Sequence, residues 1–247
     1  MKRVMLTVAY DGTNYHGWQV QDGHITIESE LNRALKEITG EEIKVSGASR
    51  TDAGVHAKGN LCVFDTDARM PGEKYSYALN THLSDDIRVV DSREVDADFH
   101  PRYTLTEKTY CYRIYNSRFS DPLCRLYSHH SYIPLDTELM NRAAAYLVGE
   151  HDFKSFSSIH AVVKTTVREI TGAEVKKNGA LVEIYVKGYG FLYNMVRIIA
   201  GSLMEVGEGK YPPERIKEIL LEADRSKAGP TAPAKGLTLE NIRIIGE

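Results

Sequence analysis

Apolar segments with strand composition alternate with segments of helical periodicity along the whole chain, and this alternation limits the fold more than any other feature. The strand-like segments are residues 4–10, 43–49, 61–64, 87–95, 110–115, 167–175, 181–186 and 237–244. Apolar residues spaced three and four apart predict helices at residues 26–39, 71–79, 136–148, 192–206 and 213–221. The pattern predicts an α+β fold.

The chain length allows one large domain or two modest ones, since 247 residues exceed the usual size of about 150 per domain. Both parts of the chain show the same alternation of strand-like and helical segments, and the boundary between them is expected near residues 101–107. We therefore expect an N-terminal α/β domain at 1–105 and a C-terminal α/β domain at 106–247. Within the second, Asn178-Gly179 predicts a hairpin, and the Pro/Ala-rich residues 228–235 predict a covering loop.

Composition excludes several classes of protein. No run free of Asp, Glu, Lys and Arg exceeds ten residues, whereas a membrane-spanning helix needs about 20 apolar positions. We therefore expect a soluble protein without a membrane partner. The three cysteines are odd in number and widely spaced, which favours reduced thiols and a cytoplasmic location. The net charge of −3 means that any nucleic-acid partner needs a local basic face.

Motifs for metals and cofactors are missing from the sequence. It has no Cys-x-x-Cys, no His-Glu-x-x-His and no EF-hand loop. Gly188-Tyr189-Gly190 lacks the third glycine and the downstream acid of a dinucleotide site. We expect neither a metal nor a cofactor.

Two charged residues stand out by their surroundings. Asp52 lies in a glycine-bearing loop at residues 49–54, which by itself is typical of a turn. Arg197 is the only charged residue between Lys187 and Glu205, inside an apolar helix. Its guanidinium either extends to water or meets an acid, because an unpaired buried charge is costly. Asp52 is a candidate for that acid.

Tyrosines in the second part offer a possible contact for a nucleobase. Tyr110 and Tyr112 alternate with Cys111, so both tyrosines share one face of a strand. Aromatic side chains on an exposed sheet face can stack on unpaired bases. Alternatively, one or both fill the core with the hydroxyl group at its rim.

Five segments, taken in order, resemble the tRNA pseudouridine synthase A family almost from end to end. They are residues 10–19 (YDGTNYHGWQ), 49–57 (SRTDAGVHA), 99–100 (FH), 108–112 (KTYCY) and 194–203 (NMVRIIAGSL). The resemblance implies two ferredoxin-like (RRM-like) α/β sandwich domains with joined antiparallel sheets and a central basic cleft. It also implies a cofactor-free homodimer that converts uridine to pseudouridine at positions 38 to 40 of the tRNA anticodon stem-loop.

The resemblance also implies roles for individual residues. Asp52 matches the catalytic aspartate of the N-terminal domain, and Arg50 the arginine that holds the target nucleotide out of the stack. Tyr110 matches the tyrosine that packs against the target base, and Arg197 the basic residue paired with the aspartate. The residues expected to bind substrate are Arg50, His56, Tyr110, Lys154, Lys164 and Arg168. Phosphate contacts are expected from the four basic residues Arg50, Lys154, Lys164 and Arg168.

The chemistry implied by the resemblance leaves several alternatives open. The carboxylate of Asp52 can attack C1′ of the sugar or C6 of the base, or assist formation of a sugar-derived intermediate. A different hypothesis is a non-catalytic RNA-binding α/β module in which Asp52 only shapes a turn and Arg197 reaches water. A carboxylate-based glycoside hydrolase would need a second catalytic acid, and no comparable motif supplies one.

Overall fold

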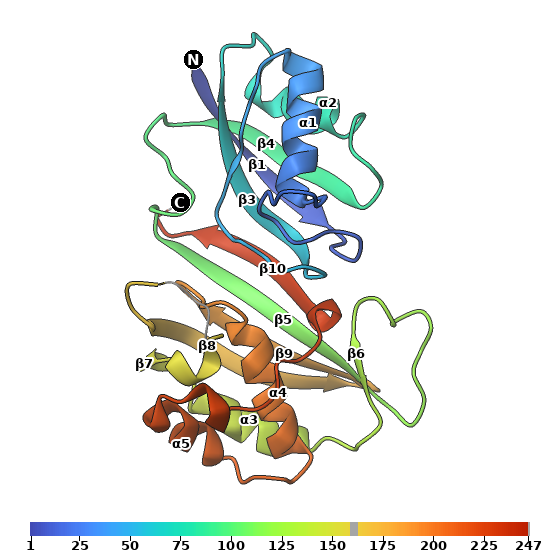
Figure 1. The fold of residues 1–247 in the computed structure, drawn as a ribbon, viewed down its shortest axis with the longest axis vertical. Coiled ribbons are helices and arrows are strands. Elements are labelled where there is room, and N and C mark those ends of the chain that lie inside the picture. The colour runs from blue at the N-terminus through green and yellow to red at the C-terminus, as the bar shows by residue number, and fades with distance from the viewer. Residues whose placement is uncertain (159–162, 247) are drawn as a thin grey trace. The chain divides into compact units, whose positions relative to one another are not determined.

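The strands and helices of the chain group into two units. The computed structural model describes residues 1–158 and 163–246 (Figure 1). One unit comprises residues 1–106 and 239–247, and the other comprises residues 107–238. The sequence placed everything after residue 105 in the second domain, whereas residues from 239 onward cluster with the first unit. Both units mix α and β structure, and their strands pair mostly antiparallel.

The first unit contains a sheet in the order β4-β1-β3-β10, with β2 beside β3. Its strands are β1 (Lys2–Tyr10), β2 (Ser46–Gly47), β3 (His56–Thr66), β4 (Ile87–Val95) and most of β10 (Leu237–Ile244). Its helices are α1 (Ile27–Thr39), the short 3-10 helix η1 (Gly72–Lys74) and α2 (Tyr75–Leu79). Helix α1 begins at a capping box between Thr26 and Ser29 and is capped at its end by Gly40, whose φ is 76°. The helix predicted at 26–39 is thereby confirmed from residue 27 onward.

Loops of the first unit converge at one end of its sheet. Tyr10, the last residue of β1, pairs with Ala57 of β3 and Ile87 of β4. Strand β1 therefore ends where β3 and β4 begin. The segment after β1 and the loop before β3 both start from this edge. These are the two segments that contain residues 10–19 and 49–57.

The second unit contains a sheet in the order β5-β9-β8-β7, with β6 parallel to β5. Its strands are β5 (Thr106–Asn116), β6 (His129–Ser131), β7 (Gly149–Asp152), β8 (Val167–Asn178) and β9 (Leu181–Gly188). Its helices are α3 (Thr137–Ala145), α4 (Met195–Gly207) and α5 (Arg215–Glu222), with 3-10 turns η2 (Lys154–Phe156), η3 (Arg225–Lys227) and η4 (Ala234–Gly236). Figure 1 shows the three helices gathered beside this sheet.

One end of the second sheet carries most of the residues of interest. Lys108 of β5 pairs with Gly188 of β9, and Val167 of β8 pairs with Asp152 of β7. Strands β5 and β8 therefore begin where β7 and β9 end. The segment from Gly188 leads from this end directly to helix α4.

The predicted strand at 43–49 is wrong for most of its length, because only Ser46–Gly47 is a strand. The backbone N–H of Val45 donates to Oδ1 of Asn32 at 2.9 Å, so a side chain takes the place of a ladder partner. The predicted hairpin is confirmed: Asn178 pairs with Leu181, and Gly179 has a φ of 58°.

Each predicted helix begins at least one residue later than the sequence predicted, and the local contacts of α3 and α4 explain their start. The predicted helix at 136–148 runs from Thr137 to Ala145, and Asp136 caps it by accepting from the N–H groups of Glu138 and Leu139. Helix α4 starts at Met195 rather than at 192, since Asn194 adopts a left-handed conformation with φ 62°. Among the described residues, no helix is long and apolar enough to span a membrane.

Candidate active site

The loop that carries Asp52 lies between β2 and β3 in the first unit. Its backbone is held on both sides of Asp52. The N–H of Trp18 donates to the carbonyl of Thr51 at 3.0 Å, and the N–H of Val55 donates to the carbonyl of Asp52 at 3.1 Å. The segment after β1 therefore fixes the loop, while the Asp52 side chain is half-buried.

Glycines allow the two segments to approach this closely. Gly17 has a φ of 82°, and a Cβ placed there would lie 2.5 Å from the carbonyl oxygen of Thr51. Gly47 faces the buried indole of Trp18, with which a Cβ would clash. Any larger residue at either position would push the Asp52 loop away from its support.

A side-chain contact also joins the loop to the sheet. The hydroxyl groups of Tyr10 and Thr51 are 2.7 Å apart, and both residues are buried. Nδ2 of Asn60, in β3, donates to the Tyr10 hydroxyl at 3.3 Å and to the carbonyl of Ser49 at 2.9 Å. Thus Thr51, directly before Asp52, is bound to β1, and Ser49, two residues before Thr51, is bound to β3.

Two other predicted residues of this motif have different environments. Arg50 is exposed, and its side chain makes no hydrogen bond or ion pair with another described residue. His56 is 4% exposed, and its Nδ1 lies 3.1 Å from both the N–H of Gly12 and Oδ1 of Asp11. His56 therefore supports the turn after β1, and its predicted contact with substrate stays a prediction.

Tyr110 lies in the second unit on strand β5 and is 6% exposed. Its ring meets that of Phe191 edge-on, with centroids 4.9 Å apart and an interplanar angle of 76°. Tyr112, on the same face, is fully buried and donates its hydroxyl proton to the carbonyl of Pro233 at 2.9 Å. Burial raises the pKa of Tyr112 well above its ordinary value. Tyr112 is thus a core residue, while Tyr110 lies beside the loop that leads into α4.

Arg197 is half-buried on helix α4, and two acceptors orient its guanidinium group. Nε donates to the carbonyl of Ala232 at 2.7 Å, and Nη1 donates to Oδ1 of Asn194 at 2.8 Å. Nδ2 of Asn194 donates in turn to Oγ of Ser158 at 2.7 Å. The guanidinium is therefore held by specific partners and does not merely extend to water.

The loop at 228–235 covers α4, as the sequence predicted. Its Ala232 accepts from Arg197 through the carbonyl and donates its own N–H to the carbonyl of Arg197 at 3.1 Å. The N–H of Gly229 donates to Oγ of Ser202 at 2.9 Å. A Cβ at Gly201 would clash with the carbonyl of Pro230, so the loop and the helix backbone are in direct contact.

Three of the basic residues predicted to bind phosphates gather where β7 ends and β8 begins. Lys154 and Lys164 are exposed, and Arg168 is half-buried. Arg168 donates to the carbonyls of Thr165 and Val167, and burial lowers its pKa. The fold of the second unit therefore brings these side chains to the sheet end at which β5 also begins.

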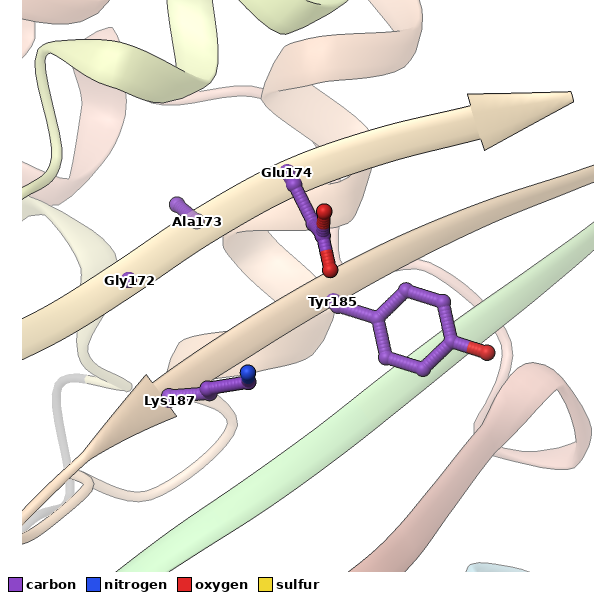
Figure 2. A pocket seen from close by; sticks show the side chains of 5 residues that line it. All are labelled: Gly172, Ala173, Glu174, Tyr185 and Lys187. Carbon is purple, nitrogen blue, oxygen red and sulfur yellow. The ribbon is translucent and has the colours of Figure 1, made fainter.

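A hollow of about 280 Å³ lies elsewhere on the second unit, over β8 and β9. Figure 2 shows Glu174 of β8 and Tyr185 and Lys187 of β9 around it. Tyr110 pairs with Val186, so its side chain shares the face of Val186 and not that of the neighbouring Tyr185 and Lys187. The hollow is therefore on the face opposite Tyr110, and none of the predicted site residues lines it.

Several supporting residues were not identified from the sequence. Tyr10, Thr51 and Asn194 lie within the quoted motifs, yet turn and strand patterns do not show which side chains their polar groups reach. Phe191 lies just outside the last motif, in a segment expected to be helical. The only sequence feature that could have pointed to Phe191 is its position next to the predicted start of the apolar helix. In the part of the chain that the structure describes, no group of three or more His, Cys, Asp or Glu side chains could hold a metal ion.

The fold and these residues define a class: an α+β protein with a carboxylate on a rigid loop, and an oriented arginine and a tyrosine on a second unit. Residues 6–104 and 143–243 match a family model described as tRNA pseudouridine synthase. The chain belongs to this family.

Relatives named tRNA pseudouridine synthase A support the assignment over nearly the whole chain. The protein of Moorella thermoacetica is 49% identical over 98% of this chain and 99% of its own length. That of Acetivibrio thermocellus is 48% identical with the same two coverages. That of Thermoanaerobacter pseudethanolicus is 46% identical over 99% of this chain and 100% of its own length.

Proposed function

We propose that this protein isomerises uridine to pseudouridine at positions 38 to 40 of the tRNA anticodon stem-loop, with Asp52 as the catalytic residue. Membership of the tRNA pseudouridine synthases carries the activity and favours it over a non-catalytic RNA-binding module. The observation in the fold that best supports the role of Asp52 is its half-buried position on a loop fixed from both sides.

The reaction needs bonds to be rearranged without net oxidation or reduction. The N1–C1′ bond breaks, the base turns, and a C5–C1′ bond forms; a proton leaves C5 and another is gained at N1. The carboxylate of Asp52 acts as a nucleophile at C1′ or C6, or assists formation of a sugar-derived intermediate. Each route needs the target nucleotide to leave the stack, which costs least for loop or mismatched uridines.

The remaining residues are assigned to holding the nucleotide and the tRNA. The exposed side chain of Arg50 suits a group that helps hold the target nucleotide out of the stack. Tyr110, held edge-on by Phe191, supplies an aromatic surface beside the base. Lys154, Lys164 and Arg168 supply the phosphate contacts that a protein of net negative charge must concentrate locally.

We further propose that Arg197 pairs with Asp52. The guanidinium is already oriented by Ala232 and Asn194 within its own unit, as a group built to receive a carboxylate would be. A positive charge beside a carboxylate favours its ionised form, which is the form needed in a nucleophile. The proposal includes two ferredoxin-like domains with joined sheets and a central basic cleft, a homodimer, and a cytoplasmic location.

Tritium release from tRNA tests the activity. Unmodified tRNA carrying tritium at uridine C5 should release tritium to water, because C5 loses its hydrogen in the reaction. Asp52→Asn should abolish release while tRNA binding stays nearly intact, since shape is preserved and charge is lost. A tRNA with uridines 38 to 40 replaced by cytidine is the control for the position. Near-normal release by Asp52→Asn would refute the assignment of the catalytic residue.

A double-mutant cycle tests the pair. Arg197→Met should also abolish release, because it removes the positive charge that we pair with the Asp52 carboxylate. If the two side chains meet, the loss of unfolding free energy in the double variant should be smaller than the sum of the two single losses. Additive losses, measured by urea unfolding, would show that the side chains do not interact.

A further inference from the structure

The contacts that hold the Asp52 loop extend beyond its backbone to a hydroxyl pair with no assigned role. Tyr10 is 5% exposed and Thr51 is 7% exposed, and their hydroxyl oxygens are 2.7 Å apart. The pair connects positions 41 residues apart in the sequence. Buried hydroxyl groups need partners, so this contact contributes to the order of the loop.

The hydroxyl group of Tyr10 is itself held in place. Asn60 is fully buried, and one proton of its amide goes to the Tyr10 oxygen at 3.3 Å. In the contact between Tyr10 and Thr51, either hydroxyl group can be the donor. The ring of Tyr10 also contacts that of Trp18, with centroids 6.0 Å apart. Tyr10 thus has a fixed position on β1, and its contact with Thr51 fixes the loop in turn.

Thr51 is the residue directly before Asp52, so its orientation sets the direction in which the chain enters Asp52. Its carbonyl oxygen accepts from Trp18, and its side chain contacts Tyr10. Both groups of Thr51 are therefore engaged by the segment around the end of β1. A rotation of Thr51 would move the Asp52 carboxylate, and displacements of about 1 Å at a reacting group can cost about 100-fold in rate.

We propose that Tyr10 and Thr51 are positioning residues: their hydroxyl–hydroxyl hydrogen bond holds the Asp52 carboxylate in its reactive orientation. This inference rests on the proposed catalytic role of Asp52. Neither hydroxyl needs to touch the tRNA, since both side chains are buried within the first unit. Loss of the bond should therefore affect turnover much more than affinity.

The test uses substitutions that remove single groups from the full-length protein. Tyr10→Phe keeps the ring and removes the hydroxyl, and Thr51→Val keeps the shape and removes the oxygen. Both should lower kcat for tritium release by about 10- to 100-fold, with the tRNA dissociation constant unchanged within about twofold. Thr51→Ser retains the oxygen and should restore most of the turnover. The double variant Tyr10→Phe/Thr51→Val should be no slower than the slower single variant.

Tyr75→Phe is the matched control. Tyr75 is a fully buried tyrosine of the same unit whose hydroxyl has no hydrogen-bond partner in the described part of the chain. The same substitution there removes a hydroxyl without touching the Asp52 loop, so kcat should be unchanged. Thermal unfolding of each variant checks the fold. If Thr51→Val does not fold, the kcat of Tyr10→Phe alone tests the inference.

The possible outcomes separate this inference from the proposed function. A parent protein that releases no tritium, or an active Asp52→Asn variant, overturns the catalytic assignment and this inference with it. An active parent, an inactive Asp52→Asn, and Tyr10→Phe with normal kcat overturn the inference alone. So does a Thr51→Ser variant as slow as Thr51→Val, because the hydroxyl would then not be the group that matters.

Discussion

Replacing Asn194 should destabilise the protein by an amount that follows from its contacts. Its Oδ1 accepts from the guanidinium of Arg197 at 2.8 Å, and its Nδ2 donates to Ser158 at 2.7 Å. A hydrogen bond to a charged group contributes about 1.5–3 kcal/mol and a neutral one about 0.5–1.5 kcal/mol. Because Asn194 is half-buried, solvent screening favours the lower ends, which together give about 2 kcal/mol.

Backbone conformation adds a second contribution that depends on the substituent. Asn194 has a φ of 62°, where alanine is strained by about 1–2 kcal/mol and glycine is not. Glycine instead gains chain entropy in the unfolded state, which costs about 0.5–1 kcal/mol. Asn194→Ala should therefore lower the unfolding free energy by about 3–4 kcal/mol, and Asn194→Gly by about 2.5–3 kcal/mol.

Urea unfolding followed by far-ultraviolet circular dichroism measures both variants against the parent. Ser158→Ala is the control for the hydrogen bond between Asn194 and Ser158, and its unfolding free energy should be lower by about 1 kcal/mol. Since Arg197 loses an orienting partner, Asn194→Gly should also lower kcat for tritium release by about tenfold or more. If Asn194→Gly were as stable as the parent, the two side-chain bonds would contribute nothing, and the reasoning from their geometry would be wrong.

Three further outcomes are expected. The association constant for tRNA should fall as salt is added, and its logarithm plotted against the logarithm of salt concentration should have a negative slope of magnitude several units. A slope near zero in a filter-binding titration would contradict the phosphate contacts assigned to Lys154, Lys164 and Arg168. Tyr110→Phe should keep most tRNA affinity, because the ring is retained. If the Tyr110 hydroxyl also transfers a proton, turnover in the variant should fall by about 10²–10⁴-fold. Unchanged turnover in the tritium assay would mean that Tyr110 only packs against the base. Arg3 donates two hydrogen bonds to the Asp65 carboxylate, at 2.7 and 2.8 Å, and holds the pKa of that carboxyl below its ordinary value. The pair therefore stabilises the fold fully above the ordinary carboxyl pKa of about 3.9, and this stabilisation is lost as the pH falls through the lowered pKa. Urea unfolding at several pH values should show that the unfolding free energy of Asp65→Asn declines less steeply in acid than that of the parent.

Elements whose ends are marked by local chemistry could be predicted from the sequence. Strands β4 and β10 span residues 87–95 and 237–244 as predicted, and Gly40 ends α1 in a left-handed conformation. These signals depend only on neighbouring residues. The strand predicted at 43–49 failed for the opposite reason: its Val45 N–H is bound by Asn32, a residue of α1 that no local pattern connects with it.

The candidate site divides in the same way. The resemblance singled out Asp52, whose loop by itself is typical of a turn, and the lone charge in an apolar helix singled out Arg197. What supports them could not be predicted, because Tyr10 at the end of a strand is typical of an ordinary core residue. Its hydroxyl gains a role only when folding places Thr51 beside it. Likewise, the pattern predicted a helix that begins at 192, whereas the left-handed backbone of Asn194 delays the helix start to Met195, and the Asn194 amide accepts from Arg197.

Residues 10–19 illustrate why a motif can be essential without supplying a reacting group. Gly17 leaves room for the Thr51 carbonyl, and Trp18 donates its N–H to that same oxygen. The indole of Trp18 then occupies the space that a side chain at position 47 would need. A substitution at Gly17 or Gly47 would therefore displace the Asp52 loop through packing alone. The requirement for glycine at these two positions therefore comes from steric fit, which holds in place the loop that carries Asp52.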